Sequence, residues 1–278
     1  MQWRPIFSKL LLRAHSNIYS GTLRDIVRKT GLNRLISKPY WKFMYSLSGR
    51  TQTHKVAGST TDFRTSTFTE FMRFRDLGGE RPVIEDVVPR LQEDDVFYDI
   101  GANVGTYTCF AASKLGPDGA FAYEPEPANA NRLRENLKLN GLDAEVIEVA
   151  LSDTDGRTVE LALSGGEAGE GEHAIATSTD GETIKVETAR GDTIIERRDL
   201  PKPTVVKVDV EGAELSVLRG LEGTLSENGR LAYVEVHPEK ITGFGDRPSE
   251  VTEFLSELGF KTTEIAHRGN EVFLRASK

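Results

Sequence analysis

The segment "VFYDIGANVG", from Val96 to Gly105, indicates both the fold of this chain and the position of its ligand site. A mostly apolar run from Val96 to Ile100, interrupted by Asp99, gives way to small residues, as where a buried strand ends in a tight turn. Gly101 permits that turn, and Gly105 lets the next helix begin close to the sheet. In an open parallel sheet, ligands bind beyond the carboxyl ends of the strands. This segment is therefore a candidate cofactor-binding loop.

Strand-like and helix-like segments alternate along the chain from Pro82 onward. The predicted strands are 96–100, 120–123, 145–150, 204–210 and 231–236, and the predicted helices are 82–91, 106–115, 128–139, 213–225 and 249–258. Such alternation is typical of an α/β fold, a mostly parallel sheet with helices on both faces. Residues 260–276 instead predict two strands joined by a short turn, a hairpin that leaves one strand antiparallel.

The loop favours one cofactor class over another. A dinucleotide-binding loop has the pattern G-x-G-x-x-G, but here Asn103 replaces the second glycine and Thr106 the third. An anionic Asp99 would repel a pyrophosphate, whereas it suits a ligand with an ammonium and a sulfonium group, such as S-adenosylmethionine. Glu124, at the tip of the next strand, can accept the ribose hydroxyls of either cofactor. A nicotinamide-dependent oxidoreductase thus stays as an alternative.

Charged residues gather at two further strand ends. In "VVKVDVEGAELSVLRGL", from Val205 to Leu221, the side chains of Lys207, Asp209 and Glu211 share one face of an extended chain. A buried face holds unpaired charges only at high cost, so these groups are either paired with one another or part of the chemistry.

The neighbouring strand ends in "YVEVHP", which puts Glu235 and His237 on one face. A histidine beside a carboxylate at a strand end is a candidate catalytic group. At the end of the third strand, in "EVALSDTDG", Ala150 stands where it would border an adenine ring.

The motifs "FYDIGANVGTYT", "YEPEP", "NLKLNG", "VALSDTDG", "VVKVDVEGAE", "VLRGL" and "VEVHP" occur in this order. The series resembles the FkbM family of S-adenosylmethionine-dependent methyltransferases, over residues 80–274. The resemblance implies a class I methyltransferase fold, a Rossmann-like seven-stranded sheet whose last strand is antiparallel. It also implies O-methylation, often of sugar hydroxyls in glycans or of natural products.

The resemblance also implies residue roles. Asp99, Gly101 and Asn103 would line the methionine end of the cofactor, Glu124 would hold its ribose, and Asp209, Glu211 and His237 would surround the acceptor hydroxyl. The full set of predicted cofactor-binding residues is Asp99, Gly101, Asn103, Gly105, Glu124 and Ala150.

Two mechanisms stay open at the acceptor hydroxyl. In the first, a neutral His237 takes the proton, and Asp209 or Glu235 orients the imidazole. In the second, Asp209, Glu211 and Glu235 are oxygen ligands of a divalent cation that lowers the pKa of the hydroxyl. The predicted catalytic set is thus Asp209, Glu211, Glu235 and His237.

Charge divides the chain into regions. Residues 1–55 carry one acid, Asp25, among many lysines and arginines, although the whole chain has a net charge of −8. We therefore expect a basic helical arm at 1–55, lead-in helices at 56–92, and the methyltransferase domain at 93–278 with a Gly/Asp/Glu-rich insertion at about 164–187. The arm is predicted either to pack on the body or to lie on an anionic membrane surface. A nucleic acid partner is disfavoured, because the acidic body would repel it.

Composition excludes several classes. The chain has 278 residues and a single cysteine, Cys109, so it forms no internal disulfide and no cysteine-rich metal site. We find no uninterrupted apolar run long enough for a spanning helix and no convincing secretory signal, and we expect a cytoplasmic protein, or one peripheral to a membrane. The partner expected is a small-molecule or glycan substrate. A non-catalytic module, in which the fold is only a scaffold, stays as a second alternative.

Overall fold

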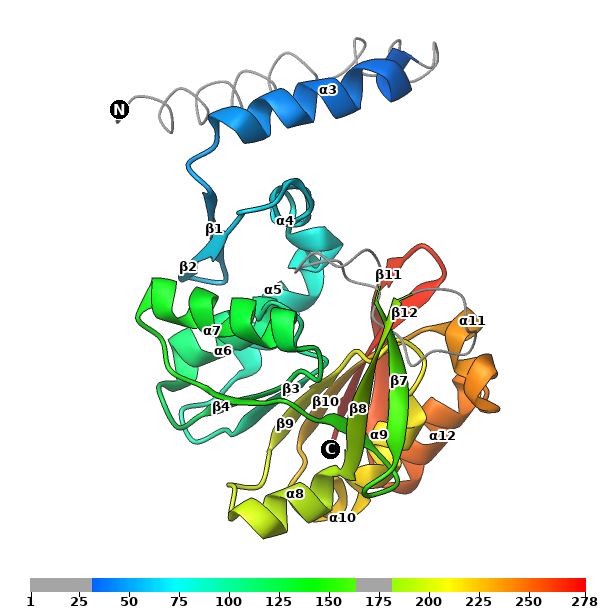
Figure 1. The fold of residues 1–278 in the computed structure, drawn as a ribbon. Coiled ribbons are helices and arrows are strands. Elements are labelled where there is room, and N and C mark those ends of the chain that lie inside the picture. The colour runs from blue at the N-terminus through cyan, green and yellow to red at the C-terminus, as the bar shows by residue number, and fades with distance from the viewer. Residues whose placement is uncertain (1–31, 164–181) are drawn as a thin grey trace.

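The computed structural model describes residues 32–163 and 182–278 (Figure 1). Its centre is a seven-stranded sheet whose strands follow one another in the order β11, β12, β10, β9, β3, β4, β5. The strands are β3 (Phe97–Ile100), β4 (Ala120–Tyr123), β5 (Glu145–Ile147), β9 (Val205–Val208), β10 (Leu231–Val236), β11 (Lys261–Arg268) and β12 (Glu271–Ser277).

One strand of this sheet runs against its neighbours. β12 pairs antiparallel with both β10 and β11, whereas β10, β9, β3, β4 and β5 are parallel. The predicted C-terminal hairpin and the single antiparallel strand are therefore confirmed. This is the strand arrangement that the resemblance implied.

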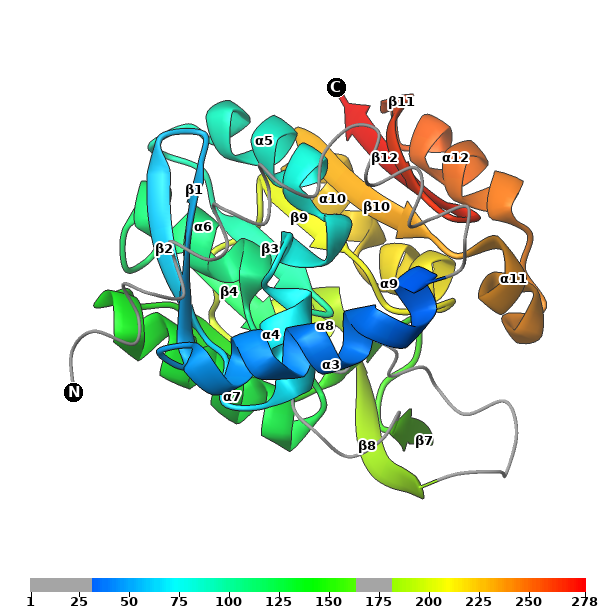
Figure 2. The ribbon, with the colours of Figure 1, turned by 90° about the horizontal axis from the view of Figure 1, so that it is seen from above.

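Helices cover both faces of the sheet (Figures 1 and 2). One face packs against α5 (Arg81–Arg90), α6 (Thr106–Leu115) and α7 (Pro127–Asn140). The other face packs against α8 (Gly191–Arg198), α9 (Glu214–Gly220) and α12 (Pro248–Glu257), while α10 (Glu222–Glu227) follows α9 directly.

Successive side chains of a strand point to opposite faces of the sheet, so the core consists of two clusters, one on each face. On β3, Phe97 faces the α6 side and Tyr98 the α9 side, and on β10 Tyr233 and Val234 divide in the same way. All of these side chains are buried. Strands that are apolar on both faces need helices on both faces, which fixes their carboxyl ends at one edge of a rigid layer.

The predicted third strand is broken in two. β5 ends at Ile147, and β6 (Ala150–Ser152) begins a separate three-stranded sheet with β8 (Glu182–Arg190) and β7 (Thr158–Leu163). Residues 164–181 of the predicted insertion lie outside the described residues, but 182–187 belong to β8, which pairs with β7.

A β-hairpin lies where the sequence analysis placed a domain boundary. β1 (Thr51–Val56) pairs antiparallel with β2 (Ser59–Arg64), so the helix expected from residue 56 is wrong for this stretch. Asn140 at the end of α7 fixes the hairpin, since its amide donates to Asp62 O and its Oδ1 accepts from Asp62 N, both at 2.7 Å. The hairpin is thus part of the body, although its polar sequence gave little sign of a strand.

The remaining lead-in elements are α3 (Leu32–Leu47), α4 (Phe68–Arg73) and η1 (Leu77–Gly79), and α11 (Pro238–Ile241) and η2 (Thr242–Phe244) follow β10. Trp41 and Tyr45 of α3 contact the ring of Phe71 on α4. The predicted arm therefore packs on the body through the end of α3, and its residues 1–31 lie outside the described residues. No helix in the described part of the chain is long and apolar enough to cross a membrane.

Candidate active site

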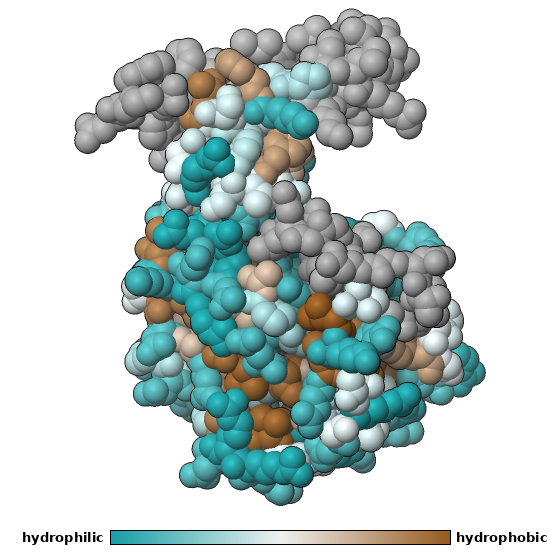
Figure 3. Space-filling view, viewed as in Figure 1, coloured by the Kyte–Doolittle hydropathy of each residue, from teal (hydrophilic) through white to brown (hydrophobic). Residues whose placement is uncertain are grey.

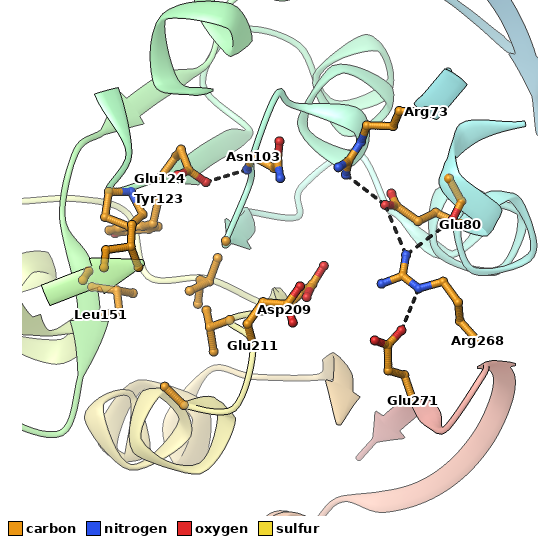
Figure 4. Close-up of a pocket in the computed structure, with 18 of the residues that line it drawn as sticks. Arg73, Glu80, Asn103, Tyr123, Glu124, Leu151, Asp209, Glu211, Arg268 and Glu271 are labelled. Atoms are coloured by element: carbon orange, nitrogen blue, oxygen red, sulfur yellow. Dashed lines mark hydrogen bonds and ion pairs between the residues drawn. The ribbon is translucent and has the colours of Figure 1, made fainter. Parts of the chain in front are cut away.

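A cavity of about 580 Å³ lies beyond the carboxyl ends of β3, β4 and β9 (Figure 4). Its walls come from segments far apart in the sequence. The lining residues are Phe68, Thr69, Met72, Arg73, Gly78, Glu80, Ile100, Gly101, Asn103, Tyr123, Glu124, Pro125, Val149, Ala150, Leu151, Leu161, Asp209, Val210, Glu211, Ala213, Arg268 and Glu271.

The loop after β3 comes unusually close to the loop after β9. Gly101 has φ +74°, and a Cβ built on it would lie 1.8 Å from the carbonyl oxygen of Asp209. Only glycine fits this position, because any other residue combines a left-handed backbone with a backbone clash. Asn103 also has a positive φ of 51°, and its N–H donates to Glu124 Oε2 at 2.7 Å. Two strand ends are thus joined at the cavity wall.

Glu124 is a buried carboxylate that lines the cavity. Its oxygens accept from the N–H groups of Asn103 at 2.7 Å and Glu126 at 2.9 Å. Burial raises the pKa of Glu124 to about 7, and the two backbone hydrogen bonds oppose that rise. An oriented acid beside the small apolar wall of Ala150 and Leu151 is suited to a ribose with its base.

Asp99 does not face the cavity as predicted. It is 0% exposed and is absent from the lining. Its Oδ2 accepts from Thr108 N at 2.9 Å and Thr108 Oγ1 at 2.6 Å, and its Oδ1 lies 3.2 Å from Lys207 Nζ. Lys207 in turn donates to Gly101 O at 3.0 Å. Asp99 therefore supports the loop from beneath, and the prediction of direct cofactor contact is corrected, because the strand pleat turns its side chain into the core.

Gly105 also lies outside the cavity lining. It has φ +85°, and a Cβ on it would lie 2.7 Å from Leu133 Cγ on α7. Its role in the described structure is close packing between the start of α6 and α7 rather than contact with a ligand.

Carboxylates surround both ring nitrogens of His237. Nδ1 lies 2.7 Å from Glu214 Oε1. Nε2 faces a group of four more distant oxygens: Glu211 Oε2 at 3.2 Å, Asp209 Oδ1 at 3.8 Å, Glu271 Oε1 at 3.9 Å and Glu235 Oε1 at 4.0 Å. The structure thus brings together the four predicted catalytic residues, and it adds Glu214 and Glu271.

The surroundings of His237 differ from those assumed for a base. Burial disfavours the imidazolium, but the hydrogen bond with Glu214 and the charges of Glu211 and Asp209 outweigh burial, and they raise the pKa of His237 above its ordinary value. His237 is also 2% exposed and does not line the cavity. Lys240 and Arg268 also contact acids of this cluster, so His237 is one of several basic groups that balance its negative charge.

The acids of the cluster differ in environment. Burial opposes ionisation of Asp209, but Lys207 and His237 outweigh it and lower the pKa of Asp209. Burial and then Asp209 raise the pKa of Glu235 to about 10, although Arg268 Nη2 donates to Glu235 at 2.6 Å. Asp209 lines the cavity as a carboxylate, whereas Glu235 lies behind it.

Glu211 has a backbone conformation rare for a residue with a side chain. Its φ is +57°, in the left-handed region. Such strain is concentrated at functional sites, where the surroundings hold it in place. The conformation turns the carboxylate toward both His237 and the cavity, whose lining includes it.

Four charged lining residues were missed by the sequence analysis: Arg73, Glu80, Arg268 and Glu271. Arg73 pairs with Glu80 at 3.1 Å, and Arg268 pairs with Glu271 at 2.7 Å and with Glu80 at 3.8 Å (Figure 4). They come from α4, the residue before α5, the end of β11 and the start of β12. Charged side chains near turns are usually solvated, so only the fold shows that these four side chains meet at the cavity. The one local sign in the sequence was the charged stretch "HRGNE".

The Rossmann-like sheet, a glycine-dependent loop after its first strand and an oriented acid after the second fit the class of S-adenosylmethionine-dependent methyltransferases, although they also suit a dinucleotide. Residues 99–262 match the model of the methyltransferase FkbM domain. The chain is also 35% identical over 209 residues to the hexuronic acid methyltransferase AglP of Haloferax volcanii, a match covering 75% of this chain and 81% of AglP. The chain belongs to the FkbM methyltransferase family.

Other relatives share less of the chain. The 2-O-methyltransferase NoeI of Sinorhizobium fredii is 30% identical over 57% of this chain and 70% of its own length. The 31-O-demethyl-FK506 methyltransferase FkbM of Streptomyces tacrolimicus is 28% identical over 53% of this chain and 67% of its own. A crystal structure of a methyltransferase FkbM from Methylobacillus flagellatus superposes with a TM-score of 0.49 at 18% identity, covering 67% of this chain and 44% of that one.

Family membership decides between the three classes of protein that the sequence analysis left open. The chain is a methyltransferase, with S-adenosylmethionine as its cofactor, rather than a nicotinamide-dependent oxidoreductase or a non-catalytic module.

Proposed function

We propose that this enzyme transfers a methyl group from S-adenosylmethionine to a hydroxyl of a sugar, with a hexuronic acid or a glycan that contains one as the first acceptor to test. The observation that carries the proposal is one cavity with two unlike ends. One end holds the glycine loop and Glu124, and the other holds carboxylates that have His237 behind them. The likeness to a hexuronic acid methyltransferase supports the choice of acceptor.

The cofactor end would act through position. Gly101 and Asn103 would border the methionine part, Glu124 would accept from the ribose hydroxyls, and Ala150 with Leu151 would contact the adenine. When bound, S-adenosylmethionine supplies an electrophilic methyl group on a sulfonium. Lys207, Asp99 and Thr108 would act through the loop, because they hold its backbone from beneath.

The acceptor end would orient a hydroxyl and receive its proton. Asp209 and Glu211 line the cavity as hydrogen-bond acceptors, with His237 behind them. A sugar hydroxyl is a weak nucleophile, so its proton must leave as the acceptor oxygen bonds to the methyl carbon and the carbon–sulfur bond breaks. Two means of removing that proton are open: transfer to the His237–carboxylate cluster, and a divalent cation bound by the same cluster, for which the described residues offer two overlapping ligand sets.

Transfer of a labelled methyl group from S-adenosylmethionine to free hexuronic acids, and to hexoses as controls, tests the proposal. We expect label in the hexuronic acid that is stable to alkali, because a methyl ether survives conditions that hydrolyse a methyl ester. Label released by alkali would place the methyl group on the carboxylate and overturn O-methylation of a hydroxyl. Transfer to none of the sugars, by a protein that binds the cofactor, would overturn the sugar class.

A peripheral membrane contact through the basic arm is a second proposal, independent of the first. Phe43 on α3 is 56% exposed, and Lys42 beside it is exposed as well. Apolar side chains are visible on the α3 segment at the top of Figure 3. An exposed aromatic residue next to basic residues suits an anionic lipid surface. In a flotation assay with anionic vesicles, we expect the protein to float with the vesicles and a smaller fraction of Phe43→Asp to do so. Equal flotation of both proteins would contradict the membrane contact. The cytoplasmic location stays a prediction.

A further inference from the structure

We infer that Asp209, Glu211 and His237 form a binding site for one divalent cation, Mg²⁺ or Mn²⁺, at the acceptor end of the cavity. Binding of the ion stands on the geometry of the described residues alone. Its chemical use rests on the proposed function.

His237 is the residue that points to an ion. Its side chain is 1% exposed, and its Nε2 has no hydrogen-bond partner among the described residues. Nδ1 is held by Glu214 at 2.7 Å, and Glu214 is itself fixed by the N–H of Gly212 at 2.8 Å. A carboxylate that holds one ring nitrogen fixes the tautomer, so the lone pair of the other nitrogen faces outward, as in histidines that bind metals. Here that lone pair faces the carboxylates.

Distances favour one ligand set over the other. Two groups of residues offer ligand atoms that lie within 4.8 Å of one another: Asp209, Glu211, His237 and Glu235, His237, Glu271. An octahedral ion with bonds of about 2.1 Å puts neighbouring ligand atoms about 3 Å apart. Nε2 lies 3.2 Å from Glu211 and 3.8 Å from Asp209, so this set needs the smaller movement.

Access to the cavity supports the same set. Asp209 and Glu211 line the cavity, whereas Glu235 does not and is hydrogen-bonded to Arg268 at 2.6 Å. An ion bound by Asp209 and Glu211 would keep open coordination positions on the side of the cavity, where a substrate oxygen can enter. An ion at the second set would lie behind the cavity wall.

Charge also favours a cation. Acidic side chains at and around the cluster outnumber the basic ones. The acids are Glu80, Asp99, Asp209, Glu211, Glu214, Glu235 and Glu271, and the basic groups are Arg73, Lys207, His237, Lys240 and Arg268. Buried charge of one sign is costly unless it is paired, and one divalent ion reduces the excess.

The ion would serve the acceptor hydroxyl. A hydroxyl oxygen in an open coordination position has a lowered pKa, so its proton can leave through Glu271, which lines the cavity and is 27% exposed, to water. The oxygen then bonds to the methyl carbon, and the electron pair of the breaking carbon–sulfur bond stays on sulfur. His237 is in this scheme a ligand and not the base, which accounts for its position behind the carboxylates.

Lys240 is a competitor for the same site. Its Nζ lies 2.5 Å from Glu211 Oε2, the oxygen nearest to His237, and its side chain is 35% exposed. A half-exposed lysine can leave this oxygen when an ion arrives. Removal of its charge should therefore strengthen binding of the ion, a result that a purely structural cluster does not predict.

Titration of the full chain with Mn²⁺, followed by electron paramagnetic resonance of the free ion and by calorimetry, tests the inference. We expect one saturable site that Mg²⁺ displaces. Asp209→Asn should weaken Mn²⁺ binding by about tenfold or more, and Glu214→Gln, which acts through His237, should weaken it by about 10- to 100-fold. Lys240→Met should tighten it several-fold. The matched control is Lys202→Met, which removes a surface lysine paired with Glu227 at 2.7 Å and should change nothing.

Absence of saturable Mn²⁺ binding at millimolar concentration, or binding indifferent to both Asp209→Asn and Lys240→Met, would overturn the site. Cofactor binding by each variant shows that it is folded. Methyl transfer to a sugar that continues in a chelator would overturn the ion and leave the proposed function standing. Specific Mn²⁺ binding without transfer to any sugar would overturn the proposed function and leave the cation site standing.

Discussion

The two ends of the cavity are built in different ways. The cofactor end uses three segments at strand ends, with Gly101 directly after β3, Glu124 directly after β4 and Ala150 at the start of β6, and Glu124 accepts from two backbone N–H groups. The acceptor end uses side chains from many elements, joined by ion pairs. A cofactor end made of backbone and turns is specified locally, whereas an acceptor end made of paired charges exists only after folding.

The ends also treat buried charge differently. Glu124 is satisfied by two N–H groups and has no ion pair among the described residues. The acids near His237 share a limited number of basic partners, with Arg268 contacting Glu235, Glu271 and Glu80. The cofactor end therefore satisfies its buried carboxylate with backbone groups, whereas the acceptor end relies on ion pairs between side chains. The predictions below test this division.

The largest effect is expected for Asp99→Ala, a residue beneath the cofactor end. The variant leaves Lys207 buried with a partner removed, and the free energy of unfolding should fall by about 3–5 kcal/mol, measured by denaturant titration. Asp94→Ala, at an exposed position near the same strand, should stay within about 0.5 kcal/mol of the parent protein. A stable Asp99→Ala protein that has lost only cofactor affinity would restore the direct contact predicted from sequence.

Asp209→Asn should impair turnover and leave cofactor binding nearly unchanged. We expect kcat to fall by about 100-fold or more, because the variant removes the charge of a carboxylate that faces the acceptor, while the Kd for S-adenosylmethionine changes less than about threefold. Asp94→Asn is the surface control. Equal loss of cofactor affinity in Asp209→Asn would mean that the two ends are not separate.

Glu124→Gln should weaken cofactor binding and leave turnover nearly unchanged. A neutral amide is a weaker acceptor than a carboxylate for the ribose hydroxyls, so affinity for S-adenosylmethionine should fall by about 10- to 100-fold in calorimetry. Turnover at saturating cofactor should be nearly unchanged. Glu135→Gln, at an exposed position on α7, is the control. Unaltered affinity in Glu124→Gln would remove Glu124 from the cofactor site.

The smallest effect is a pH dependence of cofactor affinity. The pKa of Glu124 is about 7, and the ionised form is the better acceptor, so affinity should fall as the pH falls through 7. If only the ionised form binds, affinity at pH 6 is about tenfold lower than at pH 8. The slope should be absent from Glu124→Gln. A slope that persists in the variant would assign the dependence to another group.

Much of the fold was predictable from the chain because its signals are local. Helix α6 and strands β4 and β10 have the predicted bounds, since uninterrupted apolar runs end at glycine or polar residues. The β1–β2 hairpin was missed because its polar strand gains order from Asn140 on α7, a residue distant in sequence. The break between Ile147 and Ala150 was missed because an apolar run shows no boundary when one strand passes into the next.

The sequence by itself determined the α/β class, the loop at Gly101 and the acids after the strands, because period-two and helical patterns and strand-end motifs are properties of neighbouring residues. Only the tertiary structure decided the direction in which these groups face. The pleat turns Asp99 into the core, the fold brings Arg73 and Arg268 to the cavity, and the surrounding carboxylates raise the pKa of His237. Pairing among distant charges depends on distance in space, and spacing along the chain does not specify it.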